Sequence, residues 1–365
     1  MHHPGNRPRR LGLVLLLLSA VAVPVSGYGF HDALGSGNAI ECINLRSGAL
    51  ASSRVFGASG PSALFLNPAA LSGIEGFMTG VSASTVTWGE VVVDTTSRTK
   101  RAGRGLNALT GAMALRISPS FVLAGGVARV SDNQYDGTHY LPNDPTEPDI
   151  DRVEILSVSG GLWEALGGAS FEISDHAVAG ASAGLRFGGA DYAYTFDESF
   201  TPFVDSTSEW EWSEQEPCWH LGFVLDDGIL GVGTAYTSGT DHYSDRIAAA
   251  GRALAEHLGN STIGFEIEVI SPFDANDFIG KLSVSTPLRP EIDLLTGVGF
   301  YDGEEMERTG MAYSLGGNYR LGSLLFETAV FYSGRARKST SFPSEYSDSV
   351  EDNWTVFSIG ASYGI

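Results

Sequence analysis

The stretch Phe357-Ser-Ile-Gly-Ala-Ser-Tyr-Gly-Ile365 ends the chain, and two kinds of side chain alternate in it without a break. Apolar or aromatic residues occupy the odd positions, and Ser or Gly occupies every even position between them. Successive side chains of a β-strand point to opposite faces, so the stretch predicts a strand with one apolar face. Such a strand suits a sheet between lipid and a polar lumen, or a soluble sheet between core and water.

The same period-two pattern recurs at four other places. The rows comprise Met113, Leu115 and Ile117; Phe121, Leu123, Gly125 and Val127; the odd positions from Ala177 to Phe187; and Leu230, Val232, Thr234 and Tyr236. The chain also holds 46 Gly in 365 residues, set among Ser, Thr, Val, Phe and Tyr. This mixture is typical of many closely packed strands, and it predicts an all-β fold.

The first 27 residues predict a secretory signal peptide. Three arginines precede position 11, an uncharged apolar run of about 15 residues follows, and Val25-Ser26-Gly27 offers small residues for cleavage near Gly27. The alternative is an uncleaved N-terminal anchor, for which the run is short. No later stretch is apolar for long enough to predict a spanning helix.

If the protein is exported, the C-terminal strand can be interpreted as a membrane-insertion signal. The residues Ser358, Gly360, Tyr363 and Ile365 resemble, in type and spacing, the barrel-insertion signal of outer-membrane proteins. Together with the signal peptide, they favour lipid over a soluble core as the environment of the apolar face. We therefore expect a transmembrane antiparallel β-barrel in the cell outer membrane of a Gram-negative-type cell, inserted by the barrel-insertion machinery.

The predicted connections alternate between short turns and long loops. Short turns are predicted at 118–120, 174–176, 226–228, 288–290 and 321–323, and long loops near 94–108, 132–151, 197–216, 239–277, 302–308 and 335–352. Short periplasmic turns and longer outer loops are the usual arrangement of such barrels, and this alternation predicts 12 strands. The count becomes 14 if residues 261–270 form a strand and residues 152–173 divide into two.

Removal of the signal peptide takes away three arginines and no acid, which lowers the net charge from −21 to −24. This charge excludes nucleic acid as a partner, because its phosphates require basic patches. Many of the acids lie in the predicted loops at 191–216 and 302–307. We interpret them as solvated loop surface; bridging to lipopolysaccharide by divalent cations is the alternative, and the spacing supports no metal site.

Aromatic residues flank the first acidic loop: Tyr192, Tyr194, Phe196, Trp210, Trp212 and Trp219. They predict part of an interfacial aromatic girdle. Residues 246–258 are rich in Ala and predict a short loop helix, with Ile247, Leu254 and Leu258 along one stripe. That helix would either pack on the barrel rim or form one wall of an entry groove for an apolar ligand.

Residues 28–75 do not alternate like membrane strands. They contain Gly57 and Ala58, and then Ser62-Ala-Leu-Phe65 followed by Asn67-Pro68-Ala69 and Leu71. This region resembles the N-terminal signature of the FadL/TodX-type outer-membrane channels for hydrophobic compounds and of the related PorV/PorQ-like outer-membrane proteins. The resemblance implies that residues 28–75 act as a hatch, or plug, inside a barrel formed by residues 76–365. Such channels are usually 14-stranded, whereas the turn pattern favours 12.

The resemblance also implies a function. In the transport members, a hydrophobic ligand enters from the outer loops, passes the hatch and leaves through a kink in the barrel wall. We therefore expect a passive outer-membrane channel for small hydrophobic molecules of the fatty-acid or aromatic-hydrocarbon class, in contact with membrane lipid and lipopolysaccharide. The alternative is a PorV-like docking barrel that serves a protein secretion or surface-attachment system.

The sequence gives little support for an enzyme, and no cofactor is expected. Two G-x-S-x-G matches, at 180–184 and 360–364, lie inside alternating strands, whereas a nucleophile elbow requires a strand, a turn and a helix. His220 beside a Ser of a neighbouring strand would be a catalytic pair, but we interpret it as a rim or lumen histidine. Cys42 and Cys218 either form a disulfide or remain unpaired, and the unpaired state is favoured.

Overall fold

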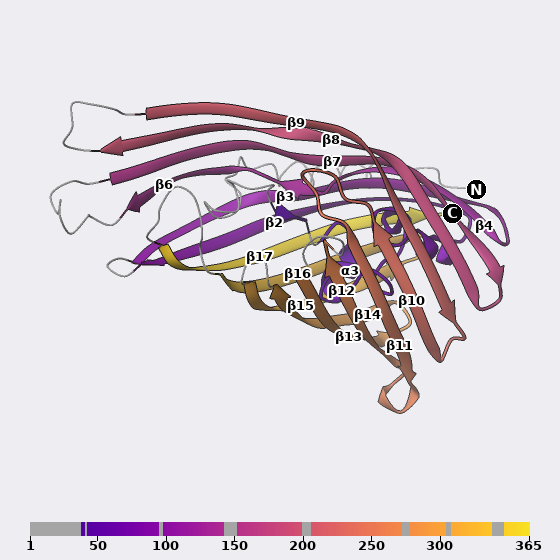
Figure 1. Cartoon of the computed structure of the whole chain (residues 1–365). Helices are drawn as coiled ribbons and strands as arrows, with labels where there is room; N and C mark the ends of the chain where they lie inside the picture. Colours follow the sequence, from indigo (N-terminus) through magenta and orange to yellow (C-terminus); the bar gives the residue numbers. More distant parts are fainter. Residues whose placement is uncertain are drawn as a thin grey trace, which may run out of the picture.

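The computed structural model describes residues 38–40, 42–94, 98–141, 152–198, 206–271, 277–303, 308–337 and 347–365. The predicted signal peptide, and part of the acidic loop at 302–307, lie outside these residues. Most of the described chain belongs to a single antiparallel sheet that closes on itself as a 14-stranded barrel (Figure 1). The prediction of an all-β barrel is confirmed, and the favoured count of 12 strands is wrong.

The barrel strands follow one another around the wall in chain order. They are β2 (Phe77–Asp94), β3 (Arg98–Ser118), β4 (Phe121–Arg129) with β6 (Tyr135–Leu141), β7 (Arg152–Ser174), β8 (Ala177–Glu198), β9 (Ser206–Asp226), β10 (Leu230–Thr237), β11 (Arg246–Ala255), β12 (Ser261–Ile270), β13 (Asp277–Arg289), β14 (Ile292–Gly303), β15 (Arg308–Leu321), β16 (Leu324–Arg337) and β17 (Ser347–Gly364). Strands β4 and β6 both pair with β7, one after the other, so together they form the third strand of the barrel.

The barrel closes between its first and last strands. Strand β17 pairs with β2 over almost its whole length, and Ile365 and Phe77 exchange backbone hydrogen bonds of 2.9 and 3.2 Å at the end of the seam. Closure leaves neither β2 nor β17 with an unpaired edge, which a membrane requires because lipid cannot hydrogen-bond a backbone.

The two additional strands come from the region that was predicted to be one long loop. Residues 246–255 form strand β11, not a helix, and residues 261–270 form β12. Residues 152–174 remain one strand. The predicted helix, with Ile247 and Leu254 on one stripe, is therefore wrong; Leu258 lies in a 3-10 turn, η3 (Glu256–Leu258). Alanine favours helices, but pairing with β10 and β12 on both sides outweighs that local preference.

Short turns gather at one end of the barrel, as predicted. The turn between β9 and β10 is stabilised by Asp227, whose carboxylate accepts backbone N–H bonds from Leu230 and Ile229. These bonds lower the pKa of the Asp227 carboxyl. At the other end the strands run farther than predicted: β3 already begins at Arg98, and β9 begins at Ser206.

The apolar rows face outward. Met113, Leu115 and Ile117 are exposed on the outer surface, as are Leu230, Val232 and the C-terminal Phe357, Tyr363 and Ile365. Trp219 also faces outward, which fits the predicted girdle. Tyr192 and Trp212 instead face the lumen, because they share the inward register of buried neighbours, so the girdle prediction is wrong for them. Among the described residues, no helix is both long and apolar enough to cross a membrane.

The N-terminal segment 42–74 lies inside the barrel (Figure 1). It contains a short helix, α3 (Leu45–Ala49), and two 3-10 turns, η1 (Pro61–Phe65) and η2 (Pro68–Gly73). A two-residue strand, β1 (Asn38–Ala39), precedes it and pairs with β5 (Ser131–Asp132). Cys42 and Cys218 are both buried and do not form a disulfide, as the favoured interpretation had it.

Candidate functional site

Glycines of the barrel wall allow the N-terminal segment to pack directly against the strands. A Cβ atom on Gly360 of β17 would lie 2.3 Å from Leu45, and one on Gly316 of β15 would lie 2.5 Å from Ala49. A Cβ on Gly168 of β7 would lie 2.7 Å from Leu64. Real Cβ atoms cannot approach so closely, so these wall positions require glycine.

The Asn67-Pro68-Ala69 turn packs on two such glycines. A Cβ on Gly222 of β9 would lie 1.8 Å from Asn67 Oδ1, and one on Gly180 of β8 would lie 2.3 Å from the Ala69 nitrogen. Asn67 also caps η2 by accepting from the Ala69 N–H at 3.2 Å, and it donates to the Val55 carbonyl at 3.0 Å. Both polar atoms of the Asn67 side chain are therefore engaged within the segment, and the side chain is completely buried.

The other residues of the predicted hatch motif are buried as well. Ala58 packs in the same apolar cluster as Leu64 and Phe65, and a Cβ on Gly57 would lie 2.2 Å from the Ser53 carbonyl oxygen. The structure therefore brings Gly57, Ala58 and the Asn67 turn into a single packed unit.

A buried ionic cluster fastens this unit to β12 and β13. The Glu266 carboxylate accepts from the Ser53 hydroxyl at 2.8 Å and from the backbone N–H groups of Arg54 and Val55 at 2.9 Å each. Lys281 donates to the Ser52 carbonyl at 2.8 Å and pairs with Glu266 at 3.1 Å. Glu266 therefore neutralises one cation while it holds three donors of the N-terminal segment.

Glu268 completes this cluster with three cations. It pairs with Arg54 at 2.8 Å and with Arg246 at 3.2 Å, and its second oxygen contacts Lys281. All of these side chains are at most 7% exposed. Charges removed from water in this way persist only when they are paired, so the cluster depends on all of its members.

A second buried cluster adjoins the first. Glu164 pairs with Arg186 at 2.6 Å and with His220 Nε2 at 3.1 Å, while His220 Nδ1 lies 3.0 Å from the Thr237 hydroxyl. Thr237 also accepts from Arg54 at 2.9 Å, which joins the two clusters. The Glu-His-Thr order resembles a nucleophile triad, but these side chains are at most 1% exposed and no substrate reaches them. The interpretation of His220 as a lumen histidine fits this geometry.

Toward the end of the barrel opposite the short turns, called the long-strand end below, the lumen is lined by aromatic and aliphatic side chains. They form one buried cluster contributed by strands from opposite sides of the barrel: Val86, Trp88, Tyr135, Leu156, Val158, Ala190, Tyr192, Ile279, Tyr301, Ala312, Phe331, Trp354 and Val356, together with Cys42. Trp88 lies opposite Trp354 in the closing seam, and its ring centre is 6.0 Å from that of Tyr135. This part of the lumen is therefore apolar, and its side chains pack on one another.

The third barrel strand is interrupted between β4 and β6. Arg129 lies opposite Trp163 of β7 and Tyr135 lies opposite Val158, so the five residues 130–134 face only the four residues 159–162. Part of the extra segment leaves β7 and pairs with β1 instead. Asp132 Oδ2 and Asn133 Nδ2 are buried there without a hydrogen-bond partner in the described part of the chain. The wall is therefore least regular at this position.

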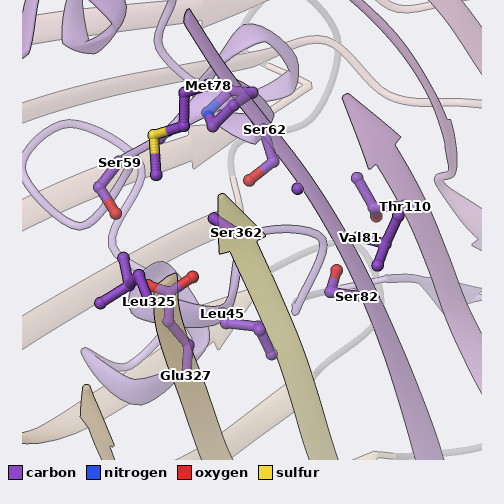
Figure 2. A pocket seen from close by; sticks show the side chains of 13 residues that line it. Leu45, Ser59, Ser62, Met78, Val81, Ser82, Thr110, Leu325, Glu327 and Ser362 are labelled. Atoms are coloured by element: carbon purple, nitrogen blue, oxygen red, sulfur yellow. The ribbon is translucent and has the colours of Figure 1, made fainter. Parts of the chain in front are cut away.

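A small polar hollow lies between the N-terminal segment and the wall near the short-turn end. Figure 2 shows Ser59 and Ser62 of the segment facing Ser362 of β17 and Glu327 of β16 across it. The free volume of the hollow is about 20 Å³, which is room for roughly one water molecule. Arg46 of α3 is half-buried nearby, and desolvation lowers the pKa of its guanidinium although Asp293 and Glu327 oppose that effect. The hollow is too small for a ligand of several carbon atoms.

The other predicted site residues lie on the outer surface or in the closing seam. Ile247 and Leu258 are exposed to the outside and do not line the lumen. In the predicted insertion signal, Ser358 faces inward and shares a 2.7 Å hydrogen bond with Ser84, while Tyr363 and Ile365 face outward.

Sequence reasoning missed the ionic clusters. The signal was present, because Glu266 and Glu268 alternate with Phe265 and Ile267, and this alternation places both carboxylates on the inner face of one strand.

Sequence comparison gives no relative. No protein-family model matches the chain, and no curated protein matches it. Comparison of structures does find similar folds. A FadL homologue of Pseudomonas aeruginosa superimposes with a TM-score of 0.65, at 13% identity, over 94% of this chain and 99% of that one.

The chain has the barrel fold of the FadL/TodX-type channels. The toluene transporter TodX of P. putida gives a TM-score of 0.61 at 11% identity, over 88% of this chain and 99% of TodX. The toluene transporter TbuX of Ralstonia pickettii gives 0.56 at 11% identity, over the same shares of the two chains. At these identities the likeness concerns the fold, and it confirms the resemblance that the N-terminal motif indicated.

We predict that Gly222→Ala lowers the free energy of unfolding by about 1–3 kcal/mol, because the new methyl group overpacks against Asn67. Unfolding in urea, followed by intrinsic tryptophan fluorescence in detergent micelles, measures the change. The matched control is Gly280→Ala on β13, where a Cβ meets nothing within 4 Å, and this variant should be neutral or slightly more stable. Equal behaviour of the two variants would contradict the close packing of the Asn67 turn.

We predict that Glu268→Gln lowers the free energy of unfolding by about 3–5 kcal/mol, because three buried cations lose their shared partner. Amide hydrogen exchange should rise in residues 50–58, which the cluster holds against β12. Glu172→Gln removes a half-exposed pair with Arg116 and should cost less than about 1 kcal/mol. Unchanged exchange at residues 50–58 in the Glu268 variant would show that the cluster does not hold the segment.

Proposed function

We propose that this protein is an outer-membrane channel for the passive passage of small hydrophobic molecules. The observation that carries the proposal is the lumen, which is apolar and aromatic toward the long-strand end and filled by the N-terminal segment toward the short-turn end. Contact with apolar side chains favours the transfer of an apolar ligand out of water. The fold shared with TodX and TbuX, which are described as toluene transporters, supports the same class of cargo.

The N-terminal segment acts as the hatch in this proposal. Its buried ions and its close contacts with wall glycines oppose a straight path to the short-turn end. The hollow between the hatch and the wall takes only about one water, so it offers no bypass. The cargo therefore leaves sideways, at the interruption of the third strand around residues 130–134.

The outer surface supports placement in a membrane. Its exposed apolar rows form a band that water would not tolerate but lipid does, and Trp219 lies on that surface. In the proposal the signal peptide directs export, and the ending Ser358–Ile365 is recognised by the insertion machinery. The transfer is downhill diffusion and involves no chemical step, in keeping with the absence of an accessible catalytic arrangement around His220 in the described chain.

The test uses the purified full-length protein in lipid vesicles. Uptake of labelled toluene and of a labelled long-chain fatty acid should exceed uptake by empty vesicles. Deletion of Gln134 removes the extra residue, so that β4 and β6 join β7 in one register, and uptake should fall toward the level of empty vesicles.

The control variant is Gln134→Ala, which keeps the chain length and should transport normally. A folded wild-type barrel that takes up neither probe would overturn the channel proposal and favour the docking role. A Gln134 deletion that transports as fast as the wild type would leave the channel standing but remove the lateral exit.

A further inference from the structure

One buried carboxylate of the lumen, that of Glu214, has no hydrogen-bond partner among the described residues. Strand β9 presents Trp212, Glu214, Cys218 and His220 on its inner face. His220 is bound by Glu164 and Thr237, but neither oxygen of Glu214 makes a hydrogen bond, and the residue is only 7% exposed. A buried acceptor without a partner costs on the order of 1–3 kcal/mol, and more when it is charged. The contacts of the described residues therefore do not explain why the Glu214 carboxylate is buried.

Along β9, ring systems lie on either side of the position of Glu214. On one side, the Trp212 ring stacks on His242 with 4.0 Å between centres, and its Nε1 donates to the Tyr192 hydroxyl at 3.1 Å. Tyr192 in turn stacks on Trp210 with 4.9 Å between centres. On the other side, the Tyr243 ring lies 4.1 Å from the Arg186 guanidinium, and Arg186 is opposite Glu216 in the register. Glu214 thus lies between two ring systems that the loop 238–245 joins.

The cation nearest in the strand register, Arg186, already has hydrogen-bond partners of its own. Arg186 donates twice to Glu164, at 2.6 and 3.0 Å, and once to the Ser238 carbonyl at 3.0 Å. The residue opposite Glu214 on β8 is Gly188, which has no side chain to offer. The described residues contain no group of three acidic, His or Cys side chains suited to a metal ion. A monovalent cationic group from outside the chain is the partner that this site lacks.

We infer that Glu214 binds the ammonium group of a hydrophobic amine, whose apolar part occupies the aromatic lumen. An ammonium group supplies the donors and the charge that Glu214 lacks, and the faces of Trp and Tyr rings attract cations. At this site Glu214 would repel a carboxylate, and a plain hydrocarbon would leave Glu214 unpaired, so we expect both to bind here more weakly than an amine while still passing through the channel. The inference rests on the proposed channel function and specifies the class of cargo within it.

Binding also involves the loop. His242 and Tyr243 contact β8 and β9 on either side of Glu214, so an amine that reaches this carboxylate must displace the stack of His242 on Trp212. The intrinsic fluorescence should therefore report binding at this site through Trp212.

The experiment compares n-octylamine, n-octanol and octanoate on the purified full-length protein in detergent micelles, by fluorescence titration at neutral pH. The amine should bind roughly tenfold or more tightly than the alcohol, as expected for a hydrogen bond to a charged group, and octanoate should bind most weakly. Glu214→Gln should remove the preference for the amine and leave octanol binding unchanged. The matched control Glu216→Gln removes a carboxylate two residues along the same face and should retain the preference.

The outcomes separate the two proposals. Equal binding of the amine and the alcohol by the wild type, or an amine preference that survives Glu214→Gln, would overturn the amine site. Loss of the preference in both variants would assign it to the general negative charge of the lumen and would also overturn the assignment to Glu214. The channel itself is tested separately by uptake of toluene into vesicles, which does not involve Glu214.

Discussion

The hydrogen bonds between the first and last strands are the constraint on which the rest of the molecule depends. In an open sheet, β2 and β17 would present unpaired backbone groups to lipid, each at a cost of several kcal/mol. Pairing from Ser347 to Gly364 removes both edges and encloses a lumen. Every other feature follows from this enclosure: the outward apolar rows, the inward polar groups, and an interior that strand side chains alone do not fill.

The N-terminal segment packs against the wall strands by two different means. Where wall and segment touch backbone to backbone, glycines such as Gly222 and Gly180 supply the space. Where charges are buried, they are matched: Glu266 and Glu268 face Arg54, Arg246 and Lys281. Close packing restricts the segment to one position. Any other position would raise the free energy, because separating the members of the ionic cluster leaves buried charges unpaired.

The two irregular places lie on the apolar side of this fastened region. The third strand carries one residue more than its partner at 130–134, and β9 carries an unpartnered carboxylate at Glu214. The described wall also has single register shifts in other strand pairs, such as those between β2 and β3 and between β7 and β8. Exceptions to local rules in an otherwise consistent structure are expected where a protein works, and both exceptions here border the aromatic lumen.

The sequence by itself determined the fold class, the lipid-facing rows and the short turns, because side-chain alternation and turn chemistry are local properties. It also marked Asn67-Pro68-Ala69 as a unit. It misplaced β11, since an Ala-rich segment such as 246–255 has a helical preference that only pairing with β10 and β12 overrides. Only the tertiary structure decided which glycines touch the N-terminal segment, that both ring nitrogens of His220 are bound, and that Glu214 has no hydrogen-bond partner in the described chain. Those facts depend on contacts between residues that are far apart in the chain and come together only inside the closed barrel. A local sequence pattern cannot predict such contacts.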